Sequence, residues 1–281
     1  MSAIFDAPNS FTKGSRPRVQ KLRKHAGRYV KSPCFFGGTY VGREISIAIE
    51  TNGKGYLGFI SELPGAFIRG KTLGEALSKA EYEAIIYQKW SGKKDILEYN
   101  AKVVQMHESN LMVEDADTEI LLNVDKGKME DFQFENYIKL ARKSCLSALN
   151  MYSATKHKNW IDEERIRKTF YGDVPKSVQE IFDHIDSVQY YYLSRICSNI
   201  KEITGFLERR EYCLKRISKK FSNENNYNIY NIDNELWTIK KVLRRFIWHD
   251  RIHAKSIIKI LKKQKDYGLI DDYYDPFFFE G

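Results

Sequence analysis

The stretch WHDRIHAKSIIKI, residues 248–260, says most about how this chain folds. It lies inside a run of helical character that we predict to extend from Asn234 to Lys265. His249 and His253 are four residues apart, so they project from one face of that helix and can hold one metal ion. Apolar residues at helical spacing here and in an earlier helix are predicted to pack in a core: Ile185, Val188, Val242, Phe246, Ile252 and Ile257.

Three more helices are predicted before this one, at residues 134–155, 177–201 and 205–221, with breakers rich in Gly, Pro or Asn between them. Four helices of this length, joined by short to moderate loops, predict a four-helix bundle over residues 130–281. The chain closes with the aromatic tail YYDPFFF, residues 273–279. Aromatic side chains this dense are predicted to dock onto the bundle or onto a partner.

Residues 34–129 have a different pattern, which predicts a small α/β module. Ile45, Ile47 and Ile49 alternate with polar residues, as in a half-buried strand, and Asn52-Gly53 is a hairpin turn signal. Thr72, with a glutamate three residues later, forms a capping box that starts a helix. Further strands are predicted at residues 56–60, 66–69, 96–106 and 119–123.

The positive charge of the chain is concentrated at its beginning. The 281 residues include 46 Lys+Arg and 37 Asp+Glu, a net charge of +9. Residues 1–33 hold eight Lys/Arg and one Asp, which leaves only +2 for the remainder. We predict that residues 1–33 are a flexible basic tail, either an arm for a polyanion such as nucleic acid or a solubilising extension.

Compartment and redox chemistry follow from the cysteines and from hydropathy. No apolar run reaches the roughly 18 residues that a membrane span needs, and the basic beginning lacks the apolar centre of a secretory signal. No two of the four cysteines have zinc or redox spacing, so a disulfide framework is not expected; they are Cys34, Cys145, Cys197 and Cys213. We predict a cytoplasmic protein without a membrane partner.

The sequence ELPGAFIRGKTLGEAL (62–77) follows the strand GYLGFIS (55–61) and precedes a helix. It resembles the HicB antitoxin-like family, and the resemblance extends over about residues 39–125. The residues that match the family pattern are Glu62, Leu63, Pro64, Gly65, Gly70, Thr72, Glu75 and Ala76. The resemblance implies a small α/β module, with an RNase-H-like or double-stranded-RNA-binding-like shape, that binds a protein or RNA partner without catalysis. Antitoxins often carry a DNA-binding segment after this module, whereas here a helical bundle follows.

A second resemblance concerns residues 132–281. HDRIHAKSIIKI (249–260) after Trp248, HIDSVQYYYLSRI (184–196) and the terminal Asp-Pro-Phe are together similar to the DinB/YfiT-like family of four-helix bundles. The resemblance implies a divalent metal site made by His184, His249 and His253. It also implies an activity with a low-molecular-weight thiol, and allows a homodimer. Without it, two histidines paired with acids such as Asp183 or Asp250 on a wet face would explain the same residues.

Three imidazoles would leave the ion open coordination positions, as catalysis requires, and they suit Zn, Ni, Fe or Co. Helical spacing nominates two neighbours of the site. Arg245, one turn before His249, either holds an anionic group of substrate or cofactor near the ion or forms a salt bridge at the end of the bundle. Tyr191, seven residues after His184, either orients a metal-bound group through its hydroxyl or packs in the core.

The sequence therefore predicts an α+β protein of two domains, a HicB-like α/β module (34–129) and an all-α DinB-like four-helix bundle (130–281). The leading functional prediction is a metal-dependent enzyme that acts on a small-molecule or peptide substrate by thiol transfer or hydrolysis. The alternative is a non-catalytic binding or regulatory protein whose HicB-like module recognises a protein or RNA partner. Metal content, measured with and without His249 and His253, discriminates between them.

Overall fold

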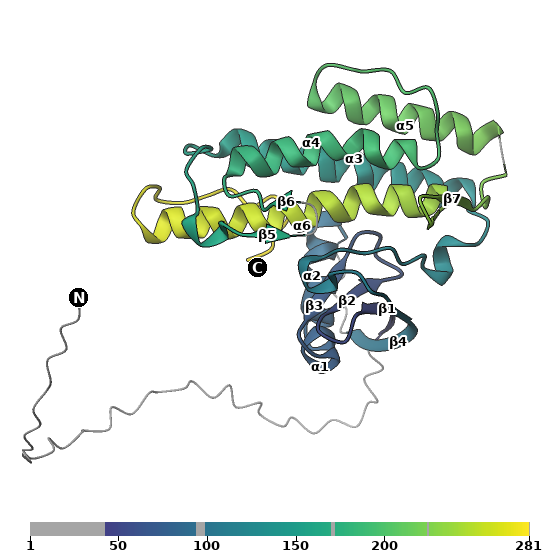
Figure 1. Cartoon of the computed structure of the whole chain (residues 1–281), viewed down its shortest axis with the longest axis horizontal. Coiled ribbons are helices and arrows are strands. Elements are labelled where there is room, and N and C mark those ends of the chain that lie inside the picture. Colours follow the sequence, from purple (N-terminus) through teal and green to yellow (C-terminus); the bar gives the residue numbers. More distant parts are fainter. Residues whose placement is uncertain (1–42, 94–98, 170–171, 224, 281) are drawn as a thin grey trace, which may run out of the picture. The chain divides into compact units, whose positions relative to one another are not determined.

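The computed structural model describes residues 43–93, 99–169, 172–223 and 225–280, so the predicted basic tail and Cys34 lie outside the described residues. The described residues belong to one compact unit. An α/β region with a mixed four-stranded sheet comes first and a helical region follows it, as predicted (Figure 1).

The sheet has the strand order β3-β2-β1-β4. Its strands are β1 (Arg43–Thr51), β2 (Tyr56–Ile60), β3 (Phe67–Gly70) and β4 (Tyr99–Glu108). Neighbouring strands are antiparallel from β3 to β1, whereas β4 pairs parallel to β1, with a bulge between Ile47 and Ala48. The parallel pairing requires a crossover connection, and two helices provide it: α1 (Leu73–Leu77) and α2 (Ala80–Ser91).

The predicted turn and the helix start are both present. Asn52-Gly53 begins the loop between β1 and β2, where Gly53 has φ +80° and the Asn52 side chain accepts hydrogen bonds from the backbone N–H groups of Lys54 and Gly55. Thr72 caps α1 by accepting from the backbone N–H of Glu75 at 3.1 Å. The predicted single helix is interrupted at residues 78–79, between α1 and α2.

The strand predicted at residues 119–123 is wrong. The backbone there forms no ladder, because side chains of the sheet take its hydrogen bonds. Glu50 accepts from the N–H of Glu119 at 3.0 Å, and Gln105 bonds the carbonyl of Leu121 and the N–H of Asn123. The segment is therefore an ordered loop along the sheet, and it ends in a short 3-10 turn (Asn123–Asp125).

Both faces of the sheet are covered. Ile45, Ile47 and Ile49 belong to a hydrophobic cluster that also contains residues of α2 and of the helical region. On the other face, Phe59 and Phe67 contact the ring of Trp248 at centroid distances of 6.0 and 6.4 Å. The α/β region thus packs directly against the helix that carries the predicted histidine pair.

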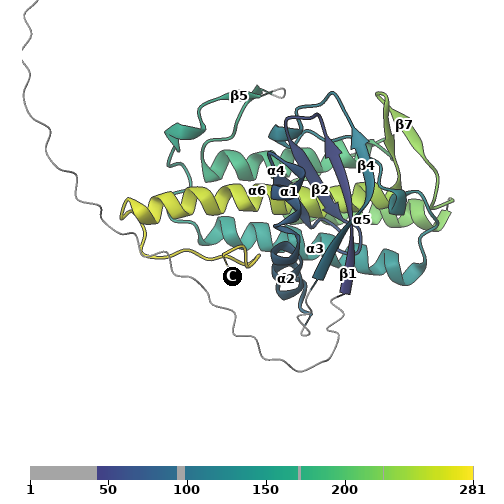
Figure 2. The same cartoon turned by 90° about the horizontal axis from the view of Figure 1, so that it is seen from below.

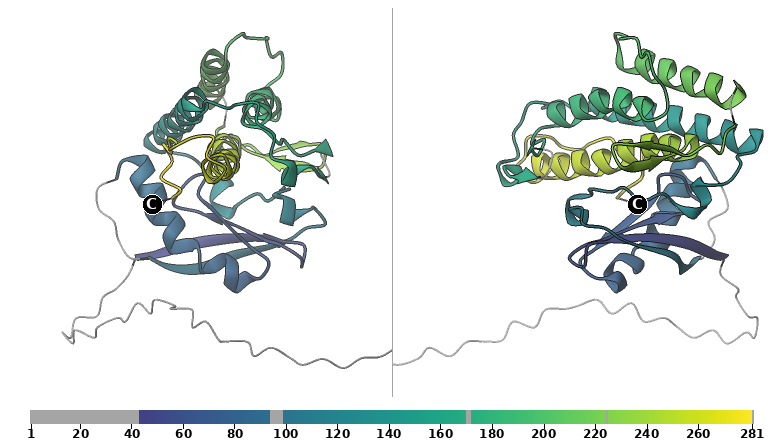
Figure 3. Two further views of the ribbon diagram at one scale, coloured as in Figure 1. Left: turned by 90° about the vertical axis from the view of Figure 1, so that its left-hand side faces the viewer. Right: turned by 45° about the vertical axis from the view of Figure 1, so that its right-hand side comes forward.

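The helical region contains four long helices, which lie on one side of the sheet (Figure 3). They are α3 (Asp131–Ala154), α4 (Val178–Ser194), α5 (Phe206–Asn223) and α6 (Ile239–Asp266). Helix α3 packs on the other three, and α4 packs on α5 and α6. Between α3 and α4 lie a 3-10 turn (Glu163–Arg165) and two short paired strands, β5 (Lys168–Thr169) and β6 (Gly172–Asp173).

Two predicted helix limits were too generous. Helix α4 ends at Ser194 and not at residue 201, because tyrosine hydroxyls take backbone N–H groups beyond it: Tyr212 bonds that of Lys201, and Tyr190 that of Ile203. Helix α6 begins at Ile239, after its N-cap Thr238. Of the residues predicted as its beginning, Glu235–Trp237 instead form strand β8, which pairs with β7 (Tyr230–Ile232) in a hairpin.

The aromatic tail docks within the molecule. After α6 the chain turns back beside that helix and reaches α2 (Figure 2). Phe277 is fully buried and stacks on Trp90 at 5.7 Å, and the carbonyl of Phe279 accepts a hydrogen bond from the Tyr82 hydroxyl at 2.8 Å. The tail therefore ties the end of the chain to the α/β region.

A tight turn at Pro64-Gly65 also touches α6. Gly65 has φ +86°, and a Cβ atom there would lie 2.5 Å from Cγ2 of Ile247 and 2.8 Å from the backbone nitrogen of Trp248. The Pro64 carbonyl accepts a hydrogen bond from Tyr87 of α2 at 2.8 Å. This close approach fixes the α/β region against the segment of α6 that precedes His249.

Candidate metal centre

The structure brings together the three histidines nominated from the sequence. Their ligand nitrogens all lie within 4.8 Å of one another. Nε2 of His249 is 3.2 Å from Nε2 of His184, and the ring of His253 lies 4.3 Å from that of His249 and 4.6 Å from that of His184. A metal–nitrogen distance of about 2.1 Å places two nitrogens of a tetrahedral site roughly 3.4 Å apart, so only small side-chain rotations separate this cluster from a metal-binding arrangement.

The surroundings keep these imidazoles neutral. Burial lowers the pKa of His184. Burial and the neighbouring histidines lower the pKa values of His249 and His253 well below the ordinary value. A neutral imidazole has the free lone pair that a metal requires, and three protonated rings at this distance would repel one another.

Two residues between His249 and His253 form buried ion pairs that fix the rotation of α6 about its axis. Asp250 is fully buried and pairs with Arg210 of α5 at 2.9 Å, while Ser144 of α3 donates to it at 2.5 Å. Arg251 is also fully buried and pairs with Glu83 of α2 at 2.8 Å. Because these two neighbours are anchored to different parts of the molecule, His249 and His253 are held towards α4.

A pocket of about 610 Å³ opens over the histidines, within the range of small-molecule sites. Its walls come from both regions of the chain. The loop 111–119 of the α/β region forms one side, α4 and α6 form the floor, and residues of the β7–β8 hairpin and of the segment 165–175 complete the rim. The site is therefore open to a ligand and is not a closed structural metal site.

The other nominated residues have distinct positions. Arg245 and Tyr191 both line the pocket. Arg245 makes no salt bridge with any residue that the structure describes, so the predicted alternative of a salt bridge is not observed. Tyr191 is 43% exposed and packs against Trp237 and Arg195, so the alternative of a core tyrosine is wrong. Asp183 bonds Gln179 on the surface of α4, away from the cluster.

Several pocket residues were not nominated from the sequence. Four of them come from loops or from an edge strand, outside the helices that carry the histidines: Arg69, Asp117, Arg165 and Arg167. Burial raises the pKa of Asp117, against the opposing effect of Arg245 and of backbone N–H groups. No periodicity or motif marks these residues. The packing of the α/β region on the helical region brings Arg69 and Asp117 to the site, and the connection between α3 and α4 brings Arg165 and Arg167.

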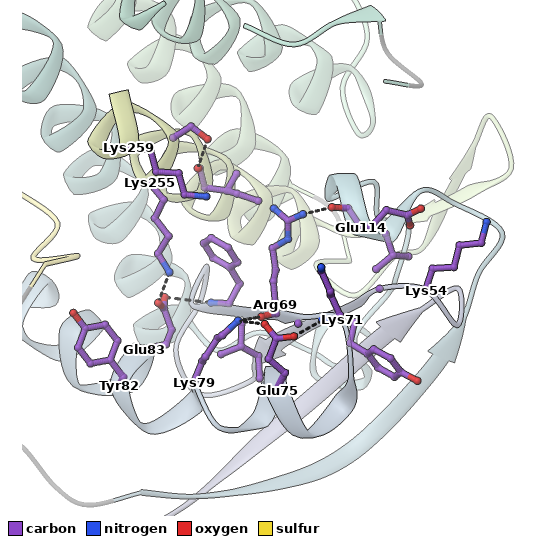
Figure 4. Close-up of a pocket in the computed structure, with 18 residues that line it drawn as sticks. Lys54, Arg69, Lys71, Glu75, Lys79, Tyr82, Glu83, Glu114, Lys255 and Lys259 are labelled. Atoms are coloured by element: carbon purple, nitrogen blue, oxygen red, sulfur yellow. Dashed lines mark hydrogen bonds and ion pairs between the residues drawn. The ribbon is translucent and has the colours of Figure 1, made fainter. Parts of the chain in front are cut away.

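A second hollow, of about 670 Å³, lies beside the first and shares Arg69 and Lys259 with it (Figure 4). Six basic side chains line this groove: Lys54, Arg69, Lys71, Lys79, Lys255 and Lys259. Two of its three acids are already paired, Glu75 with Lys79 at 2.8 Å and Glu83 with Lys255 at 2.6 Å. Burial and the neighbouring cations lower the pKa of Lys259. We name this hollow the basic groove.

Another cluster with metal-binding residue types has a structural explanation. The possible ligand atoms of this cluster all lie within 4.8 Å of one another, as those of the three histidines do; its residues are Glu50, His107 and Glu119. However, both carboxylate oxygens of the buried Glu50 already accept hydrogen bonds, from the hydroxyl of Thr118 and from the backbone N–H of Glu119. Glu50 therefore holds the loop 118–123 on the sheet.

Comparison with known proteins identifies no relative: no family model, no curated protein and no solved structure matches this chain. Among the described helices, none combines the length and the apolar composition that crossing a membrane requires.

Proposed function

We propose that His184, His249 and His253 bind one divalent metal ion and that the protein is a metal-dependent enzyme built on a DinB-like four-helix bundle. The observation that supports this most strongly is the convergence of three neutral imidazoles, two from α6 and one from α4, at the floor of an open pocket. Three imidazoles suit Zn, Ni, Fe or Co. An ion held in this way keeps open positions, at which it can lower the pKa of a water molecule or a thiol.

The chain's own residues would bind and orient the substrate. The pocket is large enough for a small molecule or a peptide end, and Tyr191 of α4, which lines it, offers a hydroxyl to a bound group. The reaction is the transfer of a low-molecular-weight thiol or a hydrolysis, since both need an activated nucleophile next to a bound substrate. The work of the α/β region in this proposal is to close one wall of the pocket and so to select the substrate.

Metal stoichiometry tests the proposal. Wild-type protein is stripped with a chelator, reloaded with Zn²⁺ or Co²⁺, desalted and analysed for bound metal. We expect about one ion per chain in the wild type and in His157→Ala, a control histidine that bonds the Leu269 carbonyl outside the cluster. His249→Ala with His253→Ala should lose the ion. A wild-type protein that retains none after reloading would rule out the metal site.

The basic groove supports a second candidate function, the binding of RNA by the HicB-like α/β region. Lys54 and Lys71 are exposed at this groove, and neither forms an ion pair with a residue in the described ranges. RNA binding would weaken as the salt concentration rises, and Lys54→Ala with Lys71→Ala would flatten that dependence. Lys219→Ala on α5 serves as the control. Equal binding by both variants at all salt concentrations would exclude the groove.

A further inference from the structure

Among the residues that the structure describes, four arginines have buried side chains, with exposed fractions between 0 and 8%: Arg210, Arg244, Arg245 and Arg251. Burial of a guanidinium is costly unless a carboxylate accompanies it. Three of the four have such a partner: Arg210 with Asp250 at 2.9 Å, Arg244 with Asp125 at 2.6 Å and Arg251 with Glu83 at 2.8 Å. The fold thus pairs its buried arginines with carboxylates as a rule.

Arg245 is the exception. It is 8% exposed, it lines the histidine pocket, and it forms no hydrogen bond or ion pair with any residue in the described part of the chain. Its Nε is buried without a partner. The guanidinium lies over the rings of Trp248, Tyr192 and Trp237 at 4.7, 5.5 and 5.8 Å. These rings attract its charge but supply no oxygen to its N–H groups.

The acids around the pocket do not accept hydrogen bonds from Arg245. Asp117 is the carboxylate whose pKa responds to the charge of Arg245, yet it is hydrogen-bonded to the backbone N–H groups of Met112 and Thr118 and not to Arg245. The other acids at the rim already have basic partners: Asp115 has Arg167, Asp233 has Arg195, Glu235 has Lys241, and Glu119 lies 3.6 Å from the imidazole of His107. The N–H donors of Arg245 therefore lack an acceptor among the described residues.

We propose that Arg245 binds a carboxylate group of the ligand whose other end reaches the three histidines. This inference rests on the proposed function and names its substrate class. A carboxylate matches the two-pronged hydrogen bonding of a single guanidinium. Its single negative charge also equals the one positive charge of Arg245, whereas a phosphate group carries nearly two.

The spacing on α6 limits the size of this ligand. Arg245 is four residues before His249, about 6 Å along the helix axis, and both side chains project from the same face. The carboxylate and the group near the histidines should therefore be separated by a short chain of a few atoms. A small thiol-containing acid satisfies both ends, since its thiol suits a three-imidazole metal site.

A pair of matched thiols tests the inference. 3-Mercaptopropionate and the uncharged 3-mercaptopropionamide have the same thiol and nearly the same shape. Each is titrated into wild-type protein in two states, metal-free with tryptophan fluorescence as the signal, because Trp248 contacts Arg245, and cobalt-loaded with visible absorption as the signal. We expect the acid to bind about 10- to 100-fold more tightly than the amide in the wild type.

Variants assign the preference to the residue. Arg245→Met should bring the ratio of the two affinities close to one, and Arg245→Lys should restore only part of it, because an ammonium cannot bond both oxygens in parallel. Arg209→Met is the matched control, since Arg209 pairs with Asp186 outside the pocket, and it should keep the wild-type ratio. Equal affinities of acid and amide in the wild type, or a preference that survives Arg245→Met, would overturn the inference. If cobalt does not bind, the metal proposal fails and the metal-free titration alone decides on Arg245.

Discussion

Glu83→Gln should lower the free energy of unfolding by about 3 kcal/mol, because it removes the charge that compensates two buried or half-buried cations. Glu83 is 2% exposed and lies between α2 and α6. One carboxylate oxygen accepts from Arg251 at 2.8 Å and the other from Lys255 at 2.6 Å, as Figure 4 shows for Lys255. Burial alone would raise the pKa of Glu83, but the charges of Lys255 and Arg251 outweigh burial and hold that pKa below its usual value.

The size of this loss in unfolding free energy follows from the cations that remain buried next to the uncharged glutamine. Its amide keeps the shape and one acceptor, but Arg251 would remain fully buried without a counter-charge, and its Nε and Nη1 already have no partner. Loss of one member of a buried ion pair costs about 3–5 kcal/mol, and the half-exposed Lys255 loses less. For a chain of this size we expect the melting temperature to fall by roughly 10 °C.

Urea denaturation, followed by far-UV circular dichroism and by tryptophan fluorescence, measures this cost. Glu81→Gln, on the exposed side of the same helix, is the control and should stay within about 0.5 kcal/mol of the wild type. Arg251→Met should lower the free energy of unfolding by less in the Glu83→Gln background than in the wild type, because the two residues stabilise each other. A loss below about 1 kcal/mol for Glu83→Gln, or strict additivity of the two substitutions, would show that the buried pair of Glu83 and Arg251 does not stabilise the fold.

Three further outcomes are expected. Gly65→Ala should cost about 2 kcal/mol or more in urea denaturation, because of its positive φ and its contact with α6, whereas Gly74→Ala in α1 has free space and should stabilise by about 0.5 kcal/mol. Phe277→Ala should cost about 3 kcal/mol through the cavity beside Trp90, whereas Phe278→Ala, 44% exposed, should stay near the wild type; equal losses would contradict the docking of the tail. Burial raises the pKa of the Cys213 thiol to about 12, so its contribution to stability is complete below about pH 9 and declines as the pH rises towards 12. Between pH 9.5 and 11, the free energy of unfolding should therefore fall with pH in both proteins, but the slope in Cys213→Ala should be smaller than in the wild type by about 1.4 kcal/mol per pH unit. Equal slopes in the two proteins would exclude a buried thiol at this position.

The sequence patterns correctly predicted the parts of the fold that depend on residues close together in the chain. The alternation in β1, the turn at Asn52-Gly53 and the Thr72 cap depend on neighbours in sequence, and the structure has all three. The segment 119–123 has strand composition but no strand, because its hydrogen bonds are taken by Glu50 and Gln105, which are distant in the chain. Composition cannot reveal such side-chain partners in advance.

The candidate site likewise contains residues that sequence patterns identify and residues that only the three-dimensional packing brings in. His249 and His253 were found through their spacing on one helix, and His184 through the resemblance of its surroundings to a known family. Asp117 carries no such signal, because it reaches the pocket from a loop of the other region. Arg245 was nominated by its position one turn from His249, but only the three-dimensional packing shows that no carboxylate of the described residues pairs with it.

Helix α6 also limits how this chain can change in length over evolution. Its side chains are fixed to partners on several sides: Lys241 to Glu235, Arg244 to Asp125, Asp250 to Arg210 and Arg251 to Glu83. One inserted or deleted residue would turn everything beyond it by about 100° and would separate each later group from its partner at once. Substitutions between Lys241 and Lys255 alter one contact at a time, whereas a change of length there breaks several together. Sequences that share this architecture should therefore align without gaps through α6, and insertions should accumulate in the loops around it.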